Sequence, residues 1–179
     1  MPRYGMVIDT RKCVGCQDCV IACKTENQIP EGYNRDWIVT ESKGKFPDIH
    51  MEIRTERCNH CSETPCVSCC PTGASHIHDV GGVVLVEHNK CIGCKACVEA
   101  CPYDARFIHP EGYADKCTFC IHRVEKGQKP ACVEVCPTYC MYFGDLDDPN
   151  SEVSKLLQSR KWHVNLPDAG TEPNIFYLV

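Results

Sequence analysis

Apolar residues occur along this chain in short groups rather than in long blocks. The longest uninterrupted apolar runs are about five residues, as at 175–179, whereas a helix that crosses a bilayer needs about 20. No segment is therefore expected to span a membrane. Residues 1–9 contain one basic side chain, no long apolar region and no small-residue cleavage site, so we expect no secretory signal there.

The pattern predicts a small number of strands. Residues 74–78 and 83–87 flank the turn residues 79–82, an arrangement that predicts a β-hairpin. Two further strands, both short, are expected at 37–40 and 49–53. None of these segments is long enough to form a large sheet by itself.

A helix is expected near the C-terminus. Val153, Leu156 and Leu157 form an i, i+3, i+4 stripe that is typical of an amphipathic helix. Asn150 or Ser151 is the expected N-cap. This segment either covers the core or docks to a partner, and the sequence leaves both interpretations open.

The composition leaves little ordinary apolar core. Leu, Ile, Val and Phe make up about a fifth of the 179 residues, barely above the level associated with disorder. Cysteine, with 18 residues, makes up about a tenth, the level at which it begins to define an architecture. The cysteines are therefore expected to supply much of the folding energy. The formal net charge of −5 argues against non-specific nucleic-acid binding, which requires a basic face.

Sixteen of the cysteines fall into four groups of four, and Cys69 and Cys140 stand outside them. The first and third groups read C-x2-C-x2-C-x3-C, the second C-x2-C-x4-C-x3-C and the fourth C-x2-C-x11-C-x3-C. Proline follows the last cysteine in every group except the first. In chain order the groups are Cys13, Cys16, Cys19 and Cys23; Cys58, Cys61, Cys66 and Cys70; Cys91, Cys94, Cys97 and Cys101; and Cys117, Cys120, Cys132 and Cys136.

Three kinds of chemistry use cysteines in such numbers. A disulfide framework suits a small secreted protein, but no signal peptide is expected here and thiols so closely spaced in series do not pair readily. Zinc sites take cysteines as two separated pairs rather than as a run of three followed by a fourth. The run C-x2-C-x2-C-x3-C-P is the bacterial ferredoxin signature, in which three thiolates bind one [4Fe-4S] cluster and the fourth reaches another. We therefore expect clusters, with a zinc-binding interaction module as the less favoured alternative.

The spacing has a geometric reason. A tight loop can reach three neighbouring corners of a cubane when ligands recur every third residue. Gly15 and Gly93, each between the first two ligands of a group, fit a loop whose backbone lies close to the cluster. After the third cysteine the chain is expected to become helical, so that the fourth cysteine points toward a second cluster.

The chain also contains an internal repeat. Residues 12–23 and 90–101 are identical at eight of twelve positions, and groups two and four share the pattern Cys-Val-x-x-Cys-Pro-Thr. These repeats predict an α+β, loop-rich fold with short strands and helices, made of two ferredoxin-like [4Fe-4S] units related by internal duplication. The expected units are residues 1–57 with 102–145 as the outer unit, residues 58–101 as the inner unit, and residues 146–179 as a C-terminal helix and tail for docking.

Several motifs together identify a resemblance. They are Cys13-Val-Gly-Cys16, Cys58-Asn-His-Cys61, Cys70-Pro-Thr-Gly-Ala74, Cys101-Pro-Tyr-Asp-Ala-Arg106, Lys116-Cys-Thr-Phe-Cys120, Cys136-Pro-Thr138 and Phe143-Gly-Asp145. With them the sequence resembles the four-cluster iron–sulfur (beta) electron-transfer subunits of molybdopterin oxidoreductases of the dimethyl-sulfoxide-reductase family. It is most similar to the polysulfide, thiosulfate and tetrathionate reductase beta subunits. The similarity covers nearly the whole chain and is looser after Asp145.

The resemblance implies four [4Fe-4S] clusters with crossed ligation. Some relatives lack one cysteine of the third group and hold a three-iron cluster, but Cys94 is present here. Cys70 is preferred to Cys69 as a ligand because of its spacing and the following Pro71, and Cys140 is expected to be a buried thiol. The implied ligands are Cys13, Cys16, Cys19 and Cys136 at site 1; Cys23, Cys117, Cys120 and Cys132 at site 2; Cys58, Cys61, Cys66 and Cys101 at site 3; and Cys70, Cys91, Cys94 and Cys97 at site 4.

The implied function is electron transfer, and no catalytic residue is expected in this chain. The resemblance implies a relay of single electrons between an integral-membrane quinone-reactive subunit and a molybdopterin (molybdenum or tungsten) catalytic subunit of a respiratory reductase for sulfur compounds. It also implies a peripheral position on the cytoplasmic membrane, with the periplasmic face favoured through co-export with the catalytic subunit and the cytoplasmic face left open. The alternative is a standalone polyferredoxin, a soluble carrier without fixed partners.

Residues beside the ligands are candidates for tuning the clusters, because charge, hydrogen bonds and solvent exposure set cluster potentials. His60 and His122 are not expected to be ligands since every cluster already has four cysteines, although a hydrogen bond from His60 is plausible. No G-x-G-x-x-G, Walker or C-x-x-C-H motif is present, so nucleotide, flavin and c-type haem chemistry lack support. The basic residues that either offset cluster charge or are ordinary solvated charges are Lys24, Arg57, Lys90, Lys95, Lys116 and Arg123.

Overall fold

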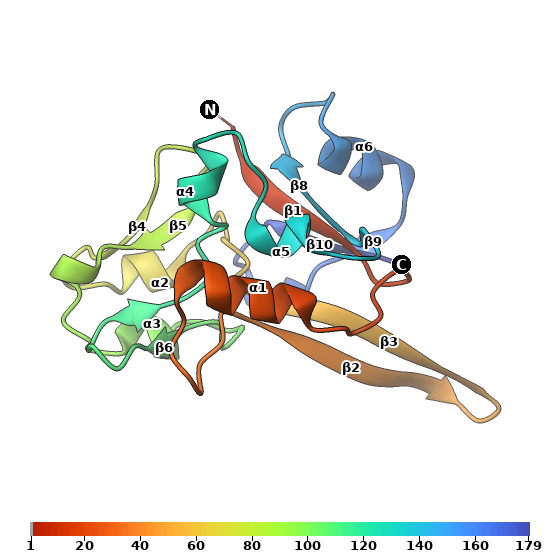
Figure 1. Cartoon of the computed structure of the whole chain (residues 1–179), viewed down its shortest axis with the longest axis horizontal. Helices are drawn as coiled ribbons and strands as arrows, with labels where there is room; N and C mark the ends of the chain where they lie inside the picture. The colour runs from red at the N-terminus through yellow and green to blue at the C-terminus, as the bar shows by residue number, and fades with distance from the viewer. Residues whose placement is uncertain (1) are drawn as a thin grey trace.

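A four-stranded sheet pairs the first and last strands of the chain (Figure 1). The computed structural model describes residues 2–179. The first strand lies antiparallel to one neighbour and parallel to the other, and its central apolar residues are fully buried. In the order in which they pair, the strands are β8 (Met141–Asp145), β1 (Tyr4–Asp9), β10 (Ile175–Leu178) and β9 (Trp162–His163).

The segment 146–179 belongs to the layer built on this sheet. Helix α6 (Glu152–Ser159) follows Ser151, whose hydroxyl accepts a hydrogen bond from the backbone N–H of Ser154 (3.2 Å), so the predicted N-cap is confirmed. Val153 of this helix is fully buried against apolar residues of β1 and β10. The apolar run at the end of the chain forms a strand of the core, β10. The docking role of residues 146–179 stays a prediction.

Three two-stranded hairpins complete the strands. The hairpin expected around residues 79–82 is confirmed. A very short pair, not expected from the pattern, follows the third cysteine group. The hairpins are β2 (Asp36–Lys45) with β3 (Asp48–Arg57), β4 (Ser75–Ile77) with β5 (Val84–Val86), and β6 (Phe107–Ile108) with β7 (Ala114–Asp115).

The β2–β3 hairpin projects from the body of the molecule (Figure 1). Each strand is ten residues long, so the prediction of two short strands was wrong in length. The two strands stay paired beyond their apolar positions, where the residues are largely charged. A search for apolar patterns does not detect such residues. Arg54 donates hydrogen bonds to three glutamates of the hairpin, namely Glu41, Glu52 and Glu56.

Short helices carry the cysteines. A helix begins one residue before the third cysteine of every group, so the expected helical turn is confirmed with its start shifted slightly. Gly15 and Gly93 both have a positive φ (68° and 65°), a conformation that glycine adopts without strain. The helices are α1 (Asp18–Asn27), α2 (Pro65–Ser68), α3 (Ala96–Glu99), α4 (Ile121–Val124) and α5 (Ala131–Glu134), with 3-10 turns η1 (His88–Lys90) and η2 (Pro167–Ala169).

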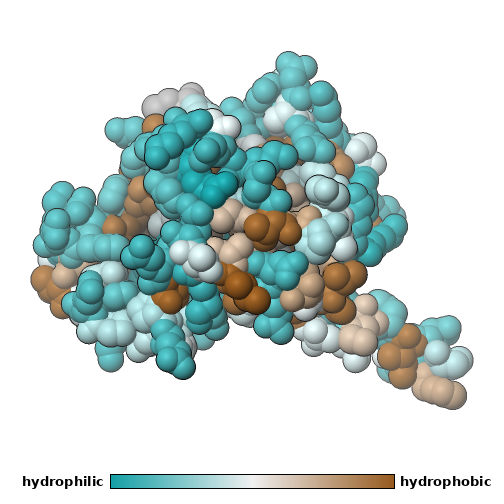
Figure 2. Space-filling view, in the orientation of Figure 1, coloured by the Kyte–Doolittle hydropathy of each residue, from teal (hydrophilic) through white to brown (hydrophobic). Residues whose placement is uncertain are grey.

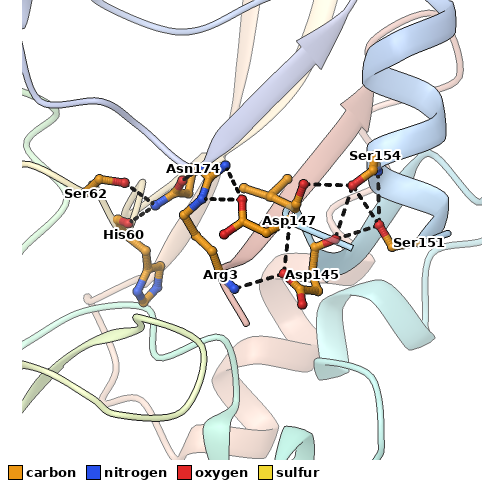
Figure 3. Close-up of polar contacts among 9 residues, drawn as sticks. Arg3, His60, Ser62, Asp145, Asp147, Ser151, Ser154 and Asn174 are labelled. Carbon is orange, nitrogen blue, oxygen red and sulfur yellow. Dashed lines mark hydrogen bonds and ion pairs between the residues drawn. The ribbon is translucent and has the colours of Figure 1, made fainter. Parts of the chain in front are cut away.

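A polar network joins the sheet to the loop that carries Cys58 and Cys61 (Figure 3). Arg3 Nη1 donates to Asn174 Oδ1, and Asn174 Nδ2 donates to the backbone carbonyl of His60, both at 2.7 Å. Asn174 is buried and directly precedes β10. The C-terminal strand therefore holds the second cysteine loop in place.

The core mixes thiols with ordinary apolar side chains, as the composition predicts. Of the fifteen buried residues in the main apolar cluster, six are cysteines. The surface in Figure 2 is largely hydrophilic, with hydrophobic patches over α1 and on the β2–β3 hairpin, where Ile21, Ile49 and Met51 are exposed. No helix within residues 2–179 has the length and apolar character required to cross a membrane.

Candidate iron–sulfur sites

The four cysteines of site 1 line one small cavity. Cys13, Cys16 and Cys19 come from the loop before α1 and its first turn, and Cys136 follows α5. Cys140 lines the same cavity, and its Sγ lies 3.4 Å from that of Cys136. The structure thus brings the predicted site 1 cysteines together from two distant segments and adds a fifth thiol.

Site 4 has the same construction, with three cysteines from the loop before α3 and its first turn and one that follows α2. The backbone N–H groups of Ala114 and Ser75 donate to sulfur atoms at this site at 3.3 and 3.4 Å. Cys69 is not among the residues that line the cavity. The cysteines that do line it are Cys70, Cys91, Cys94 and Cys97.

Site 2 lies deeper in the molecule, and all four of its cysteines are buried. Asn27 Nδ2 lies 3.7 Å from Cys23 Sγ and 3.8 Å from Cys120 Sγ, so one amide contacts thiols from two groups. Burial raises the pKa of the Cys23 thiol, and the charges of Asp36 and Cys117 raise it further. These contacts bring the first and fourth cysteine groups to the same place.

At site 3, Cys61 lies close enough to Cys58, Cys66 and Cys101 to be affected by negative charge on them. Burial raises the pKa of Cys61 to about 12, and negative charge on Cys58, Cys66 or Cys101 adds to this effect. Metal ligation requires the deprotonated thiolate. A cation beside Cys61, such as the iron of a cluster, would favour its thiolate form by compensating the negative charge.

The arrangement does not suit a single metal ion. Within the part of the chain that the structure describes, no three His, Cys, Asp or Glu side chains lie close enough together to hold one. Tetrahedral zinc needs its ligands at about 2.0–2.3 Å from one point. A [4Fe-4S] cluster instead takes one thiolate at each of its four iron corners. Thiols spread around a cavity fit a cluster better than an ion.

Three cations are buried among these thiols. Arg57, Arg106 and Lys116 are only 2%, 4% and 1% exposed. Arg57 Nη1 donates to Cys132 Sγ and Arg106 Nη2 donates to Cys66 Sγ, each at 2.9 Å. Lys116 Nζ donates to two backbone carbonyl oxygens. Positive charge is therefore concentrated where the cysteines converge.

The buried cations require buried negative charge. Burial alone would lower the pKa of Arg57, but the charges of Cys132 and Asp36 raise it well above its ordinary value. Arg57 Nε and two nitrogens of Arg106 have no hydrogen-bond partner among the described residues. Buried N–H groups normally have acceptors. Anionic clusters would supply both charge and sulfur acceptors, so the residues present fit [4Fe-4S] clusters.

The basic residues singled out in the sequence divide into two sets. Arg57 and Lys116 are buried at the sites, whereas the surface or half-buried positions are Lys24, Lys90, Lys95 and Arg123. Sequence position next to a cysteine therefore does not by itself identify a tuning residue.

The two candidate histidines differ in environment. His60 is buried, accepts a hydrogen bond from the Val84 N–H through Nδ1 (3.1 Å) and stacks on Phe119. Burial lowers its pKa well below the ordinary value, so the ring is neutral. His122 pairs with Glu26 near the surface at 2.7 Å. The His60 ring packs beside the β4–β5 hairpin, and its buried Nε2 has no hydrogen-bond partner among the described residues, so a hydrogen bond from His60 to a cluster stays a prediction.

Sequence reasoning missed the contacts that several side chains make with ligand sulfurs, among them those of Arg106, Asn27, Thr55 and Cys140. A signal for two of them exists. Asn27 and Cys140 each lie four residues after the last cysteine of their group, where the other two groups have Ala74 and Ala105. A polar residue at a position that is alanine in the other repeats indicates an added contact. Hydrogen bonds to cluster sulfurs are one determinant of potential.

Comparisons with known proteins agree with this chemistry. The family model described as "4Fe-4S dicluster domain" matches residues 49–146. The chain is 46% identical to Protein NrfC of Escherichia coli (strain K12) over 177 residues, covering 97% of this chain and 79% of that protein. It is 42% identical over 182 residues to the B component of tetrathionate reductase of Salmonella typhimurium, with 98% and 72% covered. It is 42% identical over 180 residues to the B component of polysulfide reductase of Wolinella succinogenes, with 98% and 94% covered.

The relatives confirm the resemblance that the cysteine motifs indicate. They are similar along nearly the whole chain, beyond the segment that the family model matches. The chain belongs to the 4Fe-4S dicluster family and, within it, to the iron–sulfur electron-transfer subunits of dimethyl-sulfoxide-reductase-type oxidoreductases.

Proposed function

We propose that this chain is the electron-transfer subunit of a respiratory reductase and carries four [4Fe-4S] clusters at sites 1 to 4. A cluster bound at such a site takes up and releases one electron at a time. The observation that carries the proposal is that cysteines of distant motifs lie close together, as four sets with three members from one motif and one from another require. The chain supplies thiolate ligands, buried positive charge and shielding from water, and we assign it no catalytic residue.

The buried cations support a linear order of the sites. Arg57 lies between sites 1 and 2, Lys116 between sites 2 and 3, and Arg106 between sites 3 and 4. Each cation interacts with cysteines of both neighbouring sites. We therefore propose that electrons pass along the chain in the order 1, 2, 3, 4 or the reverse.

The surface supports sites 1 and 4 as the two ends. Cys16 and Cys94 are the two exposed cysteines, whereas site 2 is entirely buried. Next to them, Val14 and Ile92 are 61% and 68% exposed. Contiguous exposed apolar patches mark docking surfaces, and an apolar side chain beside each exposed thiol would contribute to such a patch. We propose that one partner docks at each end.

The partners follow from the family. Related proteins are named as parts of tetrathionate reductase and polysulfide reductase, which supports a catalytic partner and a membrane partner. In our proposal these are a molybdopterin (molybdenum or tungsten) subunit that reduces a sulfur compound and an integral-membrane quinone-reactive subunit. The chain then lies peripherally on the cytoplasmic membrane, with the periplasmic face favoured.

Internal duplication accounts for the layout of the sites. The loops before sites 1 and 4 share their conformation, since Gln17 and Lys95 at equivalent positions both have a positive φ (68° and 65°). Helix α1 packs on α5, and α2 packs on α3. This supports an outer ferredoxin-like unit from residues 1–57 and 102–145 and an inner unit from residues 58–101.

The test uses single lysine substitutions at the two ends in the membrane-bound complex. We expect Val14→Lys to slow electron exchange with one partner and Ile92→Lys to slow exchange with the other, while both variants keep their iron. Leu166→Lys, at a residue that is 51% exposed and carries no cysteine neighbour in sequence, is the control. The measurement is stopped-flow reduction by quinol and reoxidation by the terminal substrate.

The same preparation distinguishes the alternative function. A tagged chain isolated from its native membranes should bring both partner subunits with it. Isolation as a free monomer, with unchanged electron exchange in both end variants, would favour a standalone polyferredoxin.

A further inference from the structure

Arg57 connects site 2 to site 1. Its Nη1 donates to Cys132 Sγ of site 2 (2.9 Å), and its Nη2 donates to Thr55 Oγ1 (2.6 Å). Thr55 Oγ1 in turn lies 3.7 Å from Cys19 Sγ of site 1. The arginine is fully buried at the inner end of β3, with Asp36 as a counter-ion at 3.5 Å.

Arg106 makes the equivalent connection in the other half of the molecule. Its Nη2 donates to Cys66 Sγ of site 3 (2.9 Å) and to Ser75 Oγ (3.0 Å). The backbone N–H of Ser75 donates to Cys70 Sγ of site 4 (3.4 Å). In both halves an arginine bonds directly to one ligand, and a hydroxyl-bearing residue continues the contact to a ligand of the next site.

The two arginines also occupy equivalent places relative to the cysteine motifs. Cys132 and Cys66 are both the third cysteine of a group with the shared Cys-Val-x-x-Cys-Pro-Thr pattern. The arginines themselves come from unrelated positions in the sequence, one before group two and one after group three. Two unrelated segments thus place the same guanidinium contact in two gaps between sites.

We propose that Arg57 and Arg106 are charge bridges, each holding a fixed positive charge between two consecutive clusters so that both clusters of the pair are easier to reduce. The inference rests on the proposed cluster assignment and goes beyond it. Adding an electron to a cluster adds one negative charge, which a nearby cation stabilises. A guanidinium remains protonated in proteins, and its interactions with charge are strong at buried positions. The bridge also weakens the repulsion between electrons on neighbouring clusters.

The test is a potentiometric titration of the loaded protein, followed by electron paramagnetic resonance. The spectra of the end clusters are first assigned with Cys16→Ser for site 1 and Cys94→Ser for site 4. We expect Arg57→Met to lower the equilibrium constant for reducing site 1 about tenfold, or about 59 mV for one electron, and to leave site 4 within a factor of two of its original value. Arg106→Met should show the reverse pattern.

Control variants separate charge from structure. Arg57→Lys and Arg106→Lys keep the positive charge, so the reduction potentials of sites 1 and 4 should stay close to those of the unsubstituted protein. Arg54→Met removes an arginine on the opposite face of β3, where the partners are glutamates, and should shift neither end cluster. Because Arg57→Met leaves Asp36 without its counter-ion, the paired variant Arg57→Met with Asp36→Asn is titrated beside it.

The outcomes are distinguishable. The charge bridges are supported if Arg57→Met lowers the potential of site 1 alone and Arg106→Met lowers that of site 4 alone. The proposal is overturned if neither potential shifts, if both end clusters shift equally, or if the lysine variants lower the potentials as much as the methionine variants do. Four clusters per chain in the same samples would still leave the proposed function intact. A chain without clusters overturns both.

Discussion

Removal of iron and sulfide from the protein is expected to unfold the chain. Without clusters, Arg57 keeps only Asp36 as a counter-ion, and buried Arg106 has no carboxylate partner among the described residues. An uncompensated buried charge is destabilising by about 3–5 kcal/mol, which is a large share of a total stability of about 5–15 kcal/mol. The apolar core cannot offset this, because six of the fifteen buried residues in its main cluster are the cysteines themselves.

The measurement is far-ultraviolet circular dichroism before and after anaerobic chelation of iron. A thiol reductant must be present throughout, so that disulfide formation does not cause the change, and a sample treated with reductant alone is the control. The chelated sample should lose its helix and strand signal and its cooperative thermal transition. A chelated chain that keeps both would show that the polypeptide folds independently of its clusters.

Replacement of Arg35 by methionine is expected to destabilise the loaded protein by about 3–5 kcal/mol. Arg35 forms a bidentate pair with Asp115, with distances of 3.1 Å to Oδ2 and 2.8 Å to Oδ1, and the two side chains are 9% and 4% exposed. Its Nη1 also donates to Asn27 Oδ1, and Asn27 contacts two sulfur atoms of site 2. The substitution would leave the Asp115 carboxylate buried without its partner.

The pair of Lys43 and Glu52, in which the lysine side chain is 40% exposed, provides the control. Lys43→Met removes one positive charge as well, but Glu52 keeps its bond to Arg54, so the loss should be about 0–1 kcal/mol. Anaerobic urea unfolding, followed by circular dichroism and by visible absorption, compares the two variants. Arg35→Met with Asp115→Asn should recover part of the loss. An effect of Arg35→Met no larger than that of Lys43→Met would contradict a buried ion pair.

Much of the local structure is predictable because its causes are local. The turn residues at 79–82 predict the β4–β5 hairpin, and Ser151 with the apolar stripe after it predicts the cap and start of α6. The cysteine spacing predicts helices at the third ligands. In each case the residues that determine the element are neighbours in the sequence, so the pattern is visible without the fold.

The contacts of the buried arginines join distant segments and are therefore not predictable in this way. Arg57 directly precedes Cys58 of site 3, yet it bonds to Cys132 of site 2, 75 positions away. Arg106 bonds to Cys66 across 40 positions. Lys90 is just as close to a cysteine in the sequence and is exposed to solvent. The length of the β2–β3 hairpin is also not predictable from the apolar pattern, because ion pairs between the two strands extend it.

The most direct test of this account is the quantity of iron and acid-labile sulfide bound to the chain. Protein isolated without oxygen should contain about sixteen of each per chain, as four [4Fe-4S] clusters require. Zinc in their place, or a correctly folded chain with neither iron nor sulfide, would contradict it.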